Sequence, residues 1–215
     1  MVCAILTGQK TQTRRVLKNA PPEAEWFSVY HYPSDECRDK DTQHFYAGAA
    51  GALTSFAAPC PYGQPGDRLW VRETWQHVNS PYGPYEPGCT CFYRADYFDD
   101  PHGMDGEKSP EGKYRTWIPS IHMFRNASRI LLEIISVRVE RLQEISPSDS
   151  IAEGMERTVT GDGWRRYSDP ETEAVGLPPC QYPRHSYRSL WEHINGETSW
   201  DENPWVWVVE FKQIE

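Results

Sequence analysis

The segment GQKTQTRR at positions 8–15 holds the densest group of side chains suited to chemistry in this sequence. Lys10, Arg14 and Arg15 are cations, and Thr13 adds a hydroxyl group between them. Such donors bind anions and stabilise negative charge that develops on an oxygen atom. We expect this segment to form one wall of a small polar site. The alternative is a solvated loop whose cations only favour the end of the preceding helix.

A second group of candidates lies around position 70. Trp70, Arg72 and Glu73 fall in the segment 68–75, where residue types alternate as they do in a strand with two different faces. These residues would bind substrate or nucleic acid if their side chains reach a site. Otherwise Trp70 belongs to the core, and Arg72 and Glu73 are structural ion-pairing residues.

A third group precedes a long run of β-branched residues. His122, Arg125, Ser128 and Arg129 lie in a polar stretch without a clear period. Arginine and serine suit phosphate oxygens and base edges, so these residues are candidates for nucleic-acid contacts. The alternative is a polar loop without a ligand.

Charge limits the kind of partner. The 215 residues include 22 Lys and Arg against 31 Asp and Glu, which gives a net charge of −9. An acidic chain has no overall attraction for a long phosphate backbone. Any contact with nucleic acid should therefore be local, at a nucleoside, a single-stranded segment or a modified base.

The length of the apolar runs indicates where the protein is located in the cell, and the spacing of the cysteines indicates whether it binds zinc. No apolar run reaches the ~20 residues that span a bilayer, and the short apolar start leads into a basic segment, unlike a signal peptide. We expect a cytoplasmic protein whose six cysteines are reduced. Cys89-x-Cys91, with Cys60 and Cys180, lacks the paired knuckles of zinc sites, so no metal or other cofactor is expected.

The elements that position these residues are predicted from caps and periodicity. Helices are expected at 1–8, 146–154 and 183–195, and strands at 26–32, 68–75, 91–95, 130–142 and 205–214. In the last helix, Tyr187, Leu190, Trp191 and Ile194 form one apolar stripe, which is expected to pack on a sheet and not to bind a ligand. Strands outside βαβ alternation, with short helices at their junctions, predict an α+β fold with a small, partly closed β-barrel.

Three motifs together resemble a known family. GQKTQTRR at 8–15, GDRL at 66–69 and IAEG at 151–154 resemble the signatures of the ASCH domain, a PUA-like β-barrel. Longer phrases are similar to a phage and prophage group of this family, namely CPYGQPGDRLWVRETW, PSIHMFRNASRI, VRVERLQEIS and NPWVWVVEF.

The resemblance implies a domain plan. It covers most of the chain, which we expect to be one domain over 1–215 with insertions at 16–58, 76–110 and 156–180. Members of the family usually have a strand before the first helix, whereas this sequence begins within that helix. Either the start is truncated or the barrel lacks one strand and has an unpaired edge.

The resemblance also implies a chemistry. Some small bacterial members are amidohydrolases that remove the acyl group from N4-acetylcytidine, and their catalytic residues match Lys10, Thr13 and Glu153 here. Amide hydrolysis needs a nucleophile, a base and stabilisation of an oxyanion. Lysine is a base only if its pKa falls toward the working pH. Lys10 and Thr13 would point to opposite faces of a straight strand, so the hypothesis requires a bend between them.

The sequence thus favours a polar pocket for RNA or a modified nucleoside, with a possible hydrolase activity on N4-acylcytidine-like amides. Two alternatives are a non-catalytic module for RNA or a modified base, and a phage protein whose insertions bind another protein.

Overall fold

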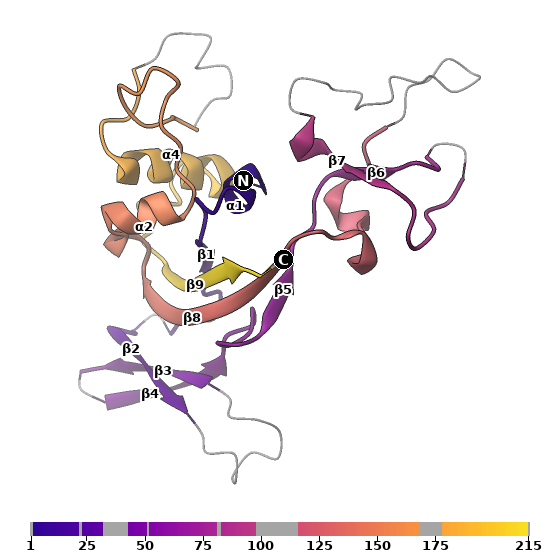
Figure 1. The fold of residues 1–215 in the computed structure, drawn as a ribbon. Coiled ribbons are helices and arrows are strands. Elements are labelled where there is room, and N and C mark those ends of the chain that lie inside the picture. The colour runs from indigo at the N-terminus through magenta and orange to yellow at the C-terminus, as the bar shows by residue number, and fades with distance from the viewer. Residues whose placement is uncertain are drawn as a thin grey trace. The chain divides into compact units, whose positions relative to one another are not determined.

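The computed structural model describes residues 2–21, 23–31, 43–50, 52–80, 83–97, 116–167 and 178–214 (Figure 1). The chain divides into two compact units, each described on its own below. The first consists of residues 3–67 and 133–212, and the second is built mainly from residues 68–132. The sequence predicts a single domain, and the second unit contains the insertion predicted at 76–110 together with segments on both sides of it.

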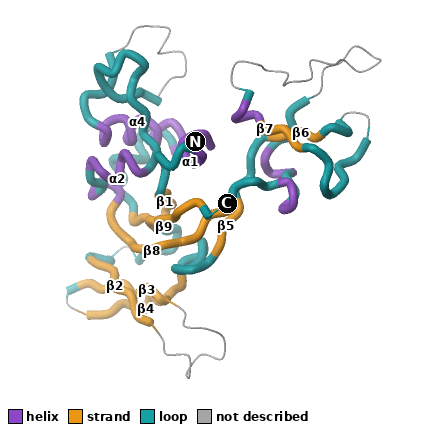
Figure 2. The backbone as a smooth tube through the Cα atoms, viewed as in Figure 1, coloured by secondary structure: helices purple, strands orange, loops and turns teal. Residues whose placement is uncertain are grey.

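The first unit is built around a curled antiparallel sheet (Figures 1 and 2). Its strands β1 (Gln12–Val16), β9 (Trp205–Gln213) and β8 (Leu131–Arg141) lie in the order β1-β9-β8. The strands predicted at 130–142 and 205–214 are confirmed. β1 was not predicted, because its sequence QTRRV has only one apolar residue. It forms by pairing with β9, in a register that places Gln12 opposite Glu210.

Helices cover one face of this sheet, and all three predicted helices are confirmed. They are α1 (Val2–Leu6), α2 (Pro147–Ala152) and α4 (Pro183–Asn195). Val206 and Val208 of β9 are fully buried and belong to the same core cluster as Tyr187 and Trp191 of α4. The predicted packing of α4 on the sheet is therefore confirmed.

The predicted insertion at 16–58 contains a second antiparallel sheet. Its strands are β2 (Trp26–His31), β3 (Gln43–Ala49) and β4 (Ala52–Pro59), in the order β2-β3-β4. β2 agrees with the predicted strand at 26–32. β3 and β4 were missed because their small residues suggested a loop, yet Ala47 is completely buried and Phe45 packs edge-on against Trp207 of β9 at 4.8 Å. Tertiary packing thus overrides a weak local preference.

The second unit has short elements joined by irregular segments. Its strands are β5 (Arg68–Trp70), β6 (Trp75–His77) and β7 (Cys91–Tyr93), and its 3-10 helices span Arg94–Asp96, Ser120–His122 and Arg125–Ala127. β7 agrees with the strand predicted at 91–95. The predicted strand 68–75 is interrupted because its backbone changes partner, from Ile130 at Val71 to Ile118 at Trp75.

The fold is mixed α+β with mostly antiparallel strands, which is compatible with a small β-barrel. Another 3-10 helix, Leu142–Glu144, connects β8 to α2. Among the described residues, no helix is both long enough and apolar enough to cross a membrane.

Candidate functional site

Backbone pairing brings the segment at 8–15 to the end of α2. The residue after α1, Gly8, adopts a φ of 71°, which glycine tolerates and which lets the chain turn away from the helix. The amide of Lys10 then donates to the carbonyl of Ala4 at 2.7 Å, and the amide of Thr11 donates to the carbonyl of Ala152 at 2.8 Å. Lys10 and Glu153 consequently form an isolated antiparallel bridge, although 143 positions separate them.

Lys10 and Glu153 form a buried ion pair. Nζ of Lys10 lies 2.9 Å from Oε2 of Glu153 and donates a second hydrogen bond, of 2.7 Å, to the Glu153 carbonyl oxygen. The two residues are only 6% and 4% exposed. Burial lowers the pKa of Lys10 despite the opposing charge of Glu153, and the nearby Arg15 and Arg14 charges lower it further.

Arg14 supports the same carboxylate from the other side. Its guanidinium donates to Oε1 of Glu153 at 3.2 Å, to Oδ2 of Asp149 at 3.3 Å and to Glu140. The side chain of Arg14 is completely buried. Arg14 was predicted to bind substrate or nucleic acid directly. Its burial and its three carboxylate partners give it a role in holding Glu153 in place, and Arg14 also lines the pocket described below.

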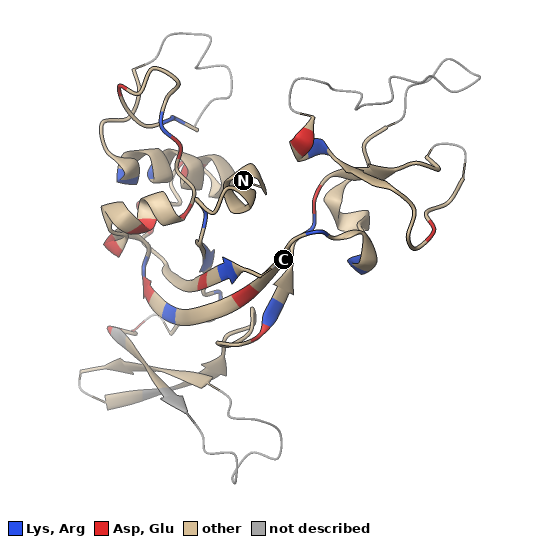
Figure 3. Cartoon of the chain, in the orientation of Figure 1, with Lys and Arg blue, Asp and Glu red and all other residues tan. Residues whose placement is uncertain are grey.

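The ion-pair network continues along the sheet, where charges of both signs are interspersed (Figure 3). Arg138 of β8 contacts Glu140, Asp149 and Glu210. Burial pushes the pKa of Asp149 upward, but hydrogen bonds from Ser146 and the charges of Arg14 and Arg138 outweigh it and lower that pKa. The Asp149 carboxylate beside Arg14 is therefore held in its charged form.

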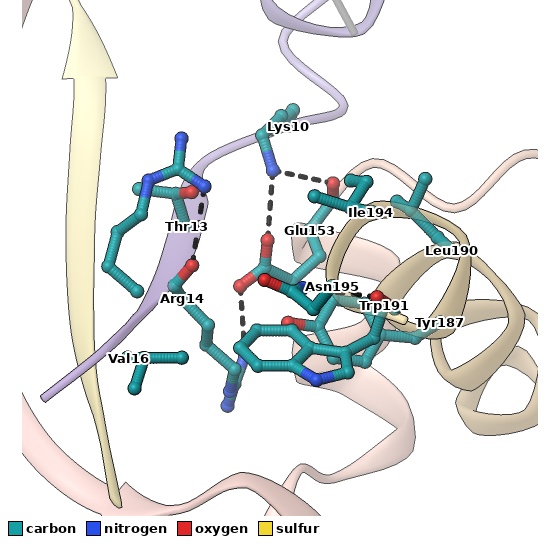
Figure 4. A pocket seen from close by; sticks show the side chains of 11 residues that line it. Lys10, Thr13, Arg14, Val16, Glu153, Tyr187, Leu190, Trp191, Ile194 and Asn195 are labelled. Carbon is teal, nitrogen blue, oxygen red and sulfur yellow. Dashed lines mark hydrogen bonds and ion pairs between the residues drawn. The ribbon is translucent and has the colours of Figure 1, made fainter. Parts of the chain in front are cut away.

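A small pocket opens beside this cluster. Its volume is about 70 Å³, and both Lys10 and Glu153 line it. Figure 4 shows Lys10 and Arg14 directed at the carboxylate of Glu153 from β1 and the segment before it, with α4 on the opposite side. The wall from α4 consists of Tyr187, Leu190, Trp191, Ile194 and Asn195. The apolar stripe of α4, predicted to serve only in packing, thus also faces the candidate site.

The β1 residues Thr13, Arg14, Arg15 and Val16 complete the lining of this pocket. The Thr13 hydroxyl has no hydrogen-bond partner in the described part of the chain. Arg15 is exposed, and its guanidinium makes one long contact, 3.5 Å, with the carbonyl oxygen of Arg14. Lys10 and Thr13 both line this pocket, but Thr13 precedes Arg14 in β1, and neighbouring side chains of a strand point to opposite faces.

The other candidates belong to the second unit. There the Trp70 ring lies between two guanidinium groups, with Arg72 at 4.7 Å and Arg125 at 5.8 Å from its centroid. Both arginines are exposed, and Arg72 also donates to the carbonyl of Ile121 at 3.3 Å. His122 is exposed, and its imidazole has no polar partner within the described ranges. These residues keep free surface for a ligand.

Glu73 and Ser128 are engaged within the second unit. Glu73 is 1% exposed and receives two hydrogen bonds from Arg129, at 3.0 and 2.9 Å. Arg129 also binds Asp96, and these carboxylates raise its pKa although burial opposes them. The Ser128 hydroxyl donates to the carbonyl of Val71 at 2.8 Å. Glu73 and Ser128 therefore stabilise the unit, in place of the predicted contact with a ligand.

The cysteines and acidic residues were also considered as metal ligands. Within the described ranges, no group of three or more His, Cys, Asp or Glu side chains is arranged to hold a metal ion. Cys60, Cys89, Cys91 and Cys180 are free thiols, and Cys37 lies outside the described residues.

Sequence analysis missed several residues around the pocket. Glu140 carries no motif, Asp149 marks only the first turn of a helix, and Asn195 only the last residue of one. The spacing of Leu190, Trp191 and Ile194 marks an apolar helix face, but that pattern is the same for a core and for a pocket wall.

No family model matches the chain, and no curated protein or solved structure shows significant similarity to it.

Proposed function

We propose that the pocket beside Lys10 binds a nucleoside or an RNA base and that the chain hydrolyses an amide of the N4-acylcytidine type, as an ASCH-type protein of the PUA-like class. The observation that carries the proposal is that Lys10, Thr13 and Glu153 line one pocket. These are the three residues that the resemblance to ASCH amidohydrolases assigns to catalysis.

In this proposal Thr13 is the nucleophile. Its hydroxyl oxygen attacks the amide carbonyl, and an acyl ester of Thr13 forms as the carbon–nitrogen bond to cytosine breaks. Neutral Lys10 accepts the proton of Thr13, and the leaving amine takes up a proton to give the free amino group of cytidine. Water then attacks the ester, which releases the carboxylic acid and restores the hydroxyl group.

The groups around Lys10 support its proposed role as the base. Burial, helped by Arg15 and Arg14, lowers its pKa and so favours the neutral amine. Glu153, at 2.9 Å, accepts a hydrogen bond from Lys10 and directs its Nζ. Trp191 and Tyr187 supply aromatic surface on the opposite wall.

Release of cytidine from N4-acetylcytidine, followed by chromatography, tests the activity. Thr13→Val and Lys10→Met should each reduce the rate by about 10²- to 10⁴-fold, whereas Thr13→Ser should retain part of it. Lys212→Ala is the matched control, because Lys212 is an exposed cation that pairs with Glu133 on the surface. Wild-type protein that releases no cytidine would disprove the activity.

A second candidate is a non-catalytic module for RNA or a modified base. It is favoured by one observation: the Lys10 ammonium is engaged by both the carboxylate and the carbonyl of Glu153. In that case Thr13→Val should leave nucleoside affinity unchanged, whereas Arg15→Ala should weaken it. Calorimetric titration with N4-acetylcytidine measures these affinities, and the cytidine-release assay separates the two candidates, because only the enzyme releases cytidine in a way that depends on the Thr13 hydroxyl.

A further inference from the structure

The α4 wall of the pocket beside Lys10 carries two polar side chains whose polar atoms have no part in the proposed hydrolysis. They are the phenol of Tyr187 and the amide of Asn195, and both residues line the pocket. Figure 4 shows them reaching from α4 toward the side on which Lys10 and Glu153 lie. A few polar groups set in an otherwise apolar wall are what orients a ligand in most small-molecule sites.

Tyr187 is buried, yet its hydroxyl group lacks a partner. The residue is only 3% exposed, and its hydroxyl makes no hydrogen bond in the part of the chain that the structure describes. In contrast to the indole nitrogen of Trp191, which is sealed from solvent without a partner, the Tyr187 hydroxyl stays accessible. Because Tyr187 lines the pocket, this hydroxyl can reach a molecule that enters it.

The Tyr187 hydroxyl keeps its proton and is therefore a donor. Burial and the negative charge of Glu153 raise the pKa of Tyr187 well above its ordinary value, although the charges of Arg14 and Arg15 oppose them. A protonated phenol donates one hydrogen bond. Both carboxylate oxygens of Glu153 are already bound, one by Lys10 and the other by Arg14. The donor of Tyr187 is thus available to a carbonyl oxygen of a ligand.

Asn195 presents the complementary group, an acceptor. Its Nδ2 donates to the carbonyl oxygen of Trp191 at 3.0 Å, one turn earlier in α4. Because a carbonyl oxygen only accepts, this bond fixes which end of the Asn195 amide faces the helix and leaves Oδ1 directed away from it. Oδ1 accepts no hydrogen bond from any residue within the described ranges. The α4 wall therefore offers a ligand one donor and one acceptor, the set that a secondary amide satisfies.

We infer that Tyr187 and Asn195 recognise the amide group that is cleaved, and that the substrate class is secondary amides. This inference rests on the proposed function. The Tyr187 hydroxyl donates to the acyl carbonyl oxygen, and Oδ1 of Asn195 accepts the amide N–H.

The same contacts act during the reaction. When the nucleophile attacks the carbonyl carbon, an electron pair of the double bond moves to oxygen, and the Tyr187 hydroxyl stabilises that charge without giving up its proton. The pair returns to the carbonyl as the carbon–nitrogen bond breaks. An ester has the same carbonyl oxygen but no N–H, so it leaves the acceptor of Asn195 without a partner and binds less well.

The test compares acetanilide, a secondary amide without base or sugar, with phenyl acetate, the matching ester, by ligand-observed NMR. Tyr187→Phe and Asn195→Ala should each weaken acetanilide binding by about 3- to 10-fold. Wild-type protein should prefer acetanilide to phenyl acetate, and Asn195→Ala should remove this preference. In the cytidine-release assay, Tyr187→Phe should lower kcat by about 10²-fold and change KM much less.

Two substitutions outside the pocket are matched controls. Tyr182→Phe removes the hydroxyl of an exposed tyrosine, and His193→Ala shortens an exposed side chain near the end of α4. Neither should alter acetanilide binding. The Tyr187→Phe variant loses only a hydroxyl that has no partner among the described residues, so its urea midpoint should equal that of the wild type. A large loss of stability in that variant would show a structural role for the hydroxyl and overturn the inference.

The outcomes separate the inference from the activity. If acetanilide binding depends on Tyr187 and Asn195 but no cytidine is released, the activity fails and the amide site stands. If cytidine is released but neither variant alters acetanilide binding, the inference fails and the activity stands. Wild-type protein that does not bind acetanilide, or binds phenyl acetate equally well, also overturns the inference.

Discussion

Glu153 is the residue on which the candidate site depends, because two cations share its carboxylate. Lys10 binds Oε2 and Arg14 binds Oε1, and all three side chains are almost completely buried. Buried charges are tolerated only when they are paired and hydrogen-bonded. Replacing Glu153 by a neutral residue should therefore destabilise the fold strongly. Replacing only one of its two basic partners should destabilise it less.

We predict that Glu153→Gln lowers the free energy of unfolding by about 3–5 kcal/mol, because it leaves the buried side chains of Arg14 and Lys10 without the carboxylate that they share. Lys10→Met should cost less, because Glu153 keeps Arg14. Urea denaturation followed by tryptophan fluorescence measures both. Equal losses of unfolding free energy in the two variants would contradict the prediction that Arg14 still stabilises Glu153 when Lys10 is replaced.

The α2 element positions Glu153 through its two ends. At its start, the Ser146 hydroxyl caps the helix by accepting a hydrogen bond of 3.0 Å from the amide of Asp149. In return, the Asp149 carboxylate accepts a hydrogen bond from the amide of Ser146. At its end, Gly154 has a φ of 89°. A Cβ atom at Gly154 would lie 3.1 Å from Cβ of Lys10, so glycine also allows the close approach of the two segments.

Gly154→Ala should therefore destabilise the protein more than Gly8→Ala. Both residues have positive φ, which costs about 1–2 kcal/mol for alanine, but a Cβ at Gly8 meets nothing within 4 Å. At Gly154 crowding against Lys10 adds about 1–3 kcal/mol. Because both variants share the cost of positive φ, the difference between their urea midpoints measures the destabilisation caused by crowding at Gly154. Identical midpoints would show that crowding does not destabilise the protein.

The Asp149 carboxylate should make stability depend on acid pH. Its pKa is lowered in the folded state, so its contribution is complete above the ordinary value of 3.8 and disappears as the pH falls through the folded-state pKa. Asp149→Asn should cost about 1 kcal/mol at neutral pH, and the cost should vanish in strong acid. Denaturation of both proteins from pH 7 to pH 2 measures this. A difference that does not change with pH would show that the charge of Asp149 contributes nothing.

At the scale of the molecule, charge limits how nucleic acid is bound. Net charge is −9, and many of the basic groups in the first unit are paired with carboxylates, as Arg14, Arg138 and Lys212 are. Within the described ranges, Arg15 and Lys18 are exposed and make no ion pair. Affinity for RNA should therefore come from stacking and two local phosphate contacts, without a broad basic surface.

This arrangement predicts a weak dependence of RNA binding on salt. Two phosphate contacts to a single strand give a slope of about −1.4 in a plot of log affinity against log salt concentration. Anisotropy titrations from 50 to 300 mM salt, at roughly evenly spaced concentrations, measure the slope. Lys18→Ala should halve it, and a slope several times steeper would indicate a wider cationic surface than the one described.

The amino-acid sequence alone determined the features that depend on near neighbours. Ser146 and Pro147 begin α2, Gly196 ends α4, and the β-branched run at 130–142 forms β8, because caps and strand propensity act over a few residues. The chemistry-bearing segment at 8–15 was also recognisable from its residue types.

Only the tertiary structure decided which partners those residues meet. The sequence QTRRV becomes β1 because β9 pairs with it, and Arg14, which looks like a surface cation, is buried because Glu140, Asp149 and Glu153 surround it. Lys10 meets Glu153 across 143 positions, a contact that no local pattern encodes. Long-range pairing of backbone and charge therefore converts a basic segment into a buried acid–base pair beside a pocket.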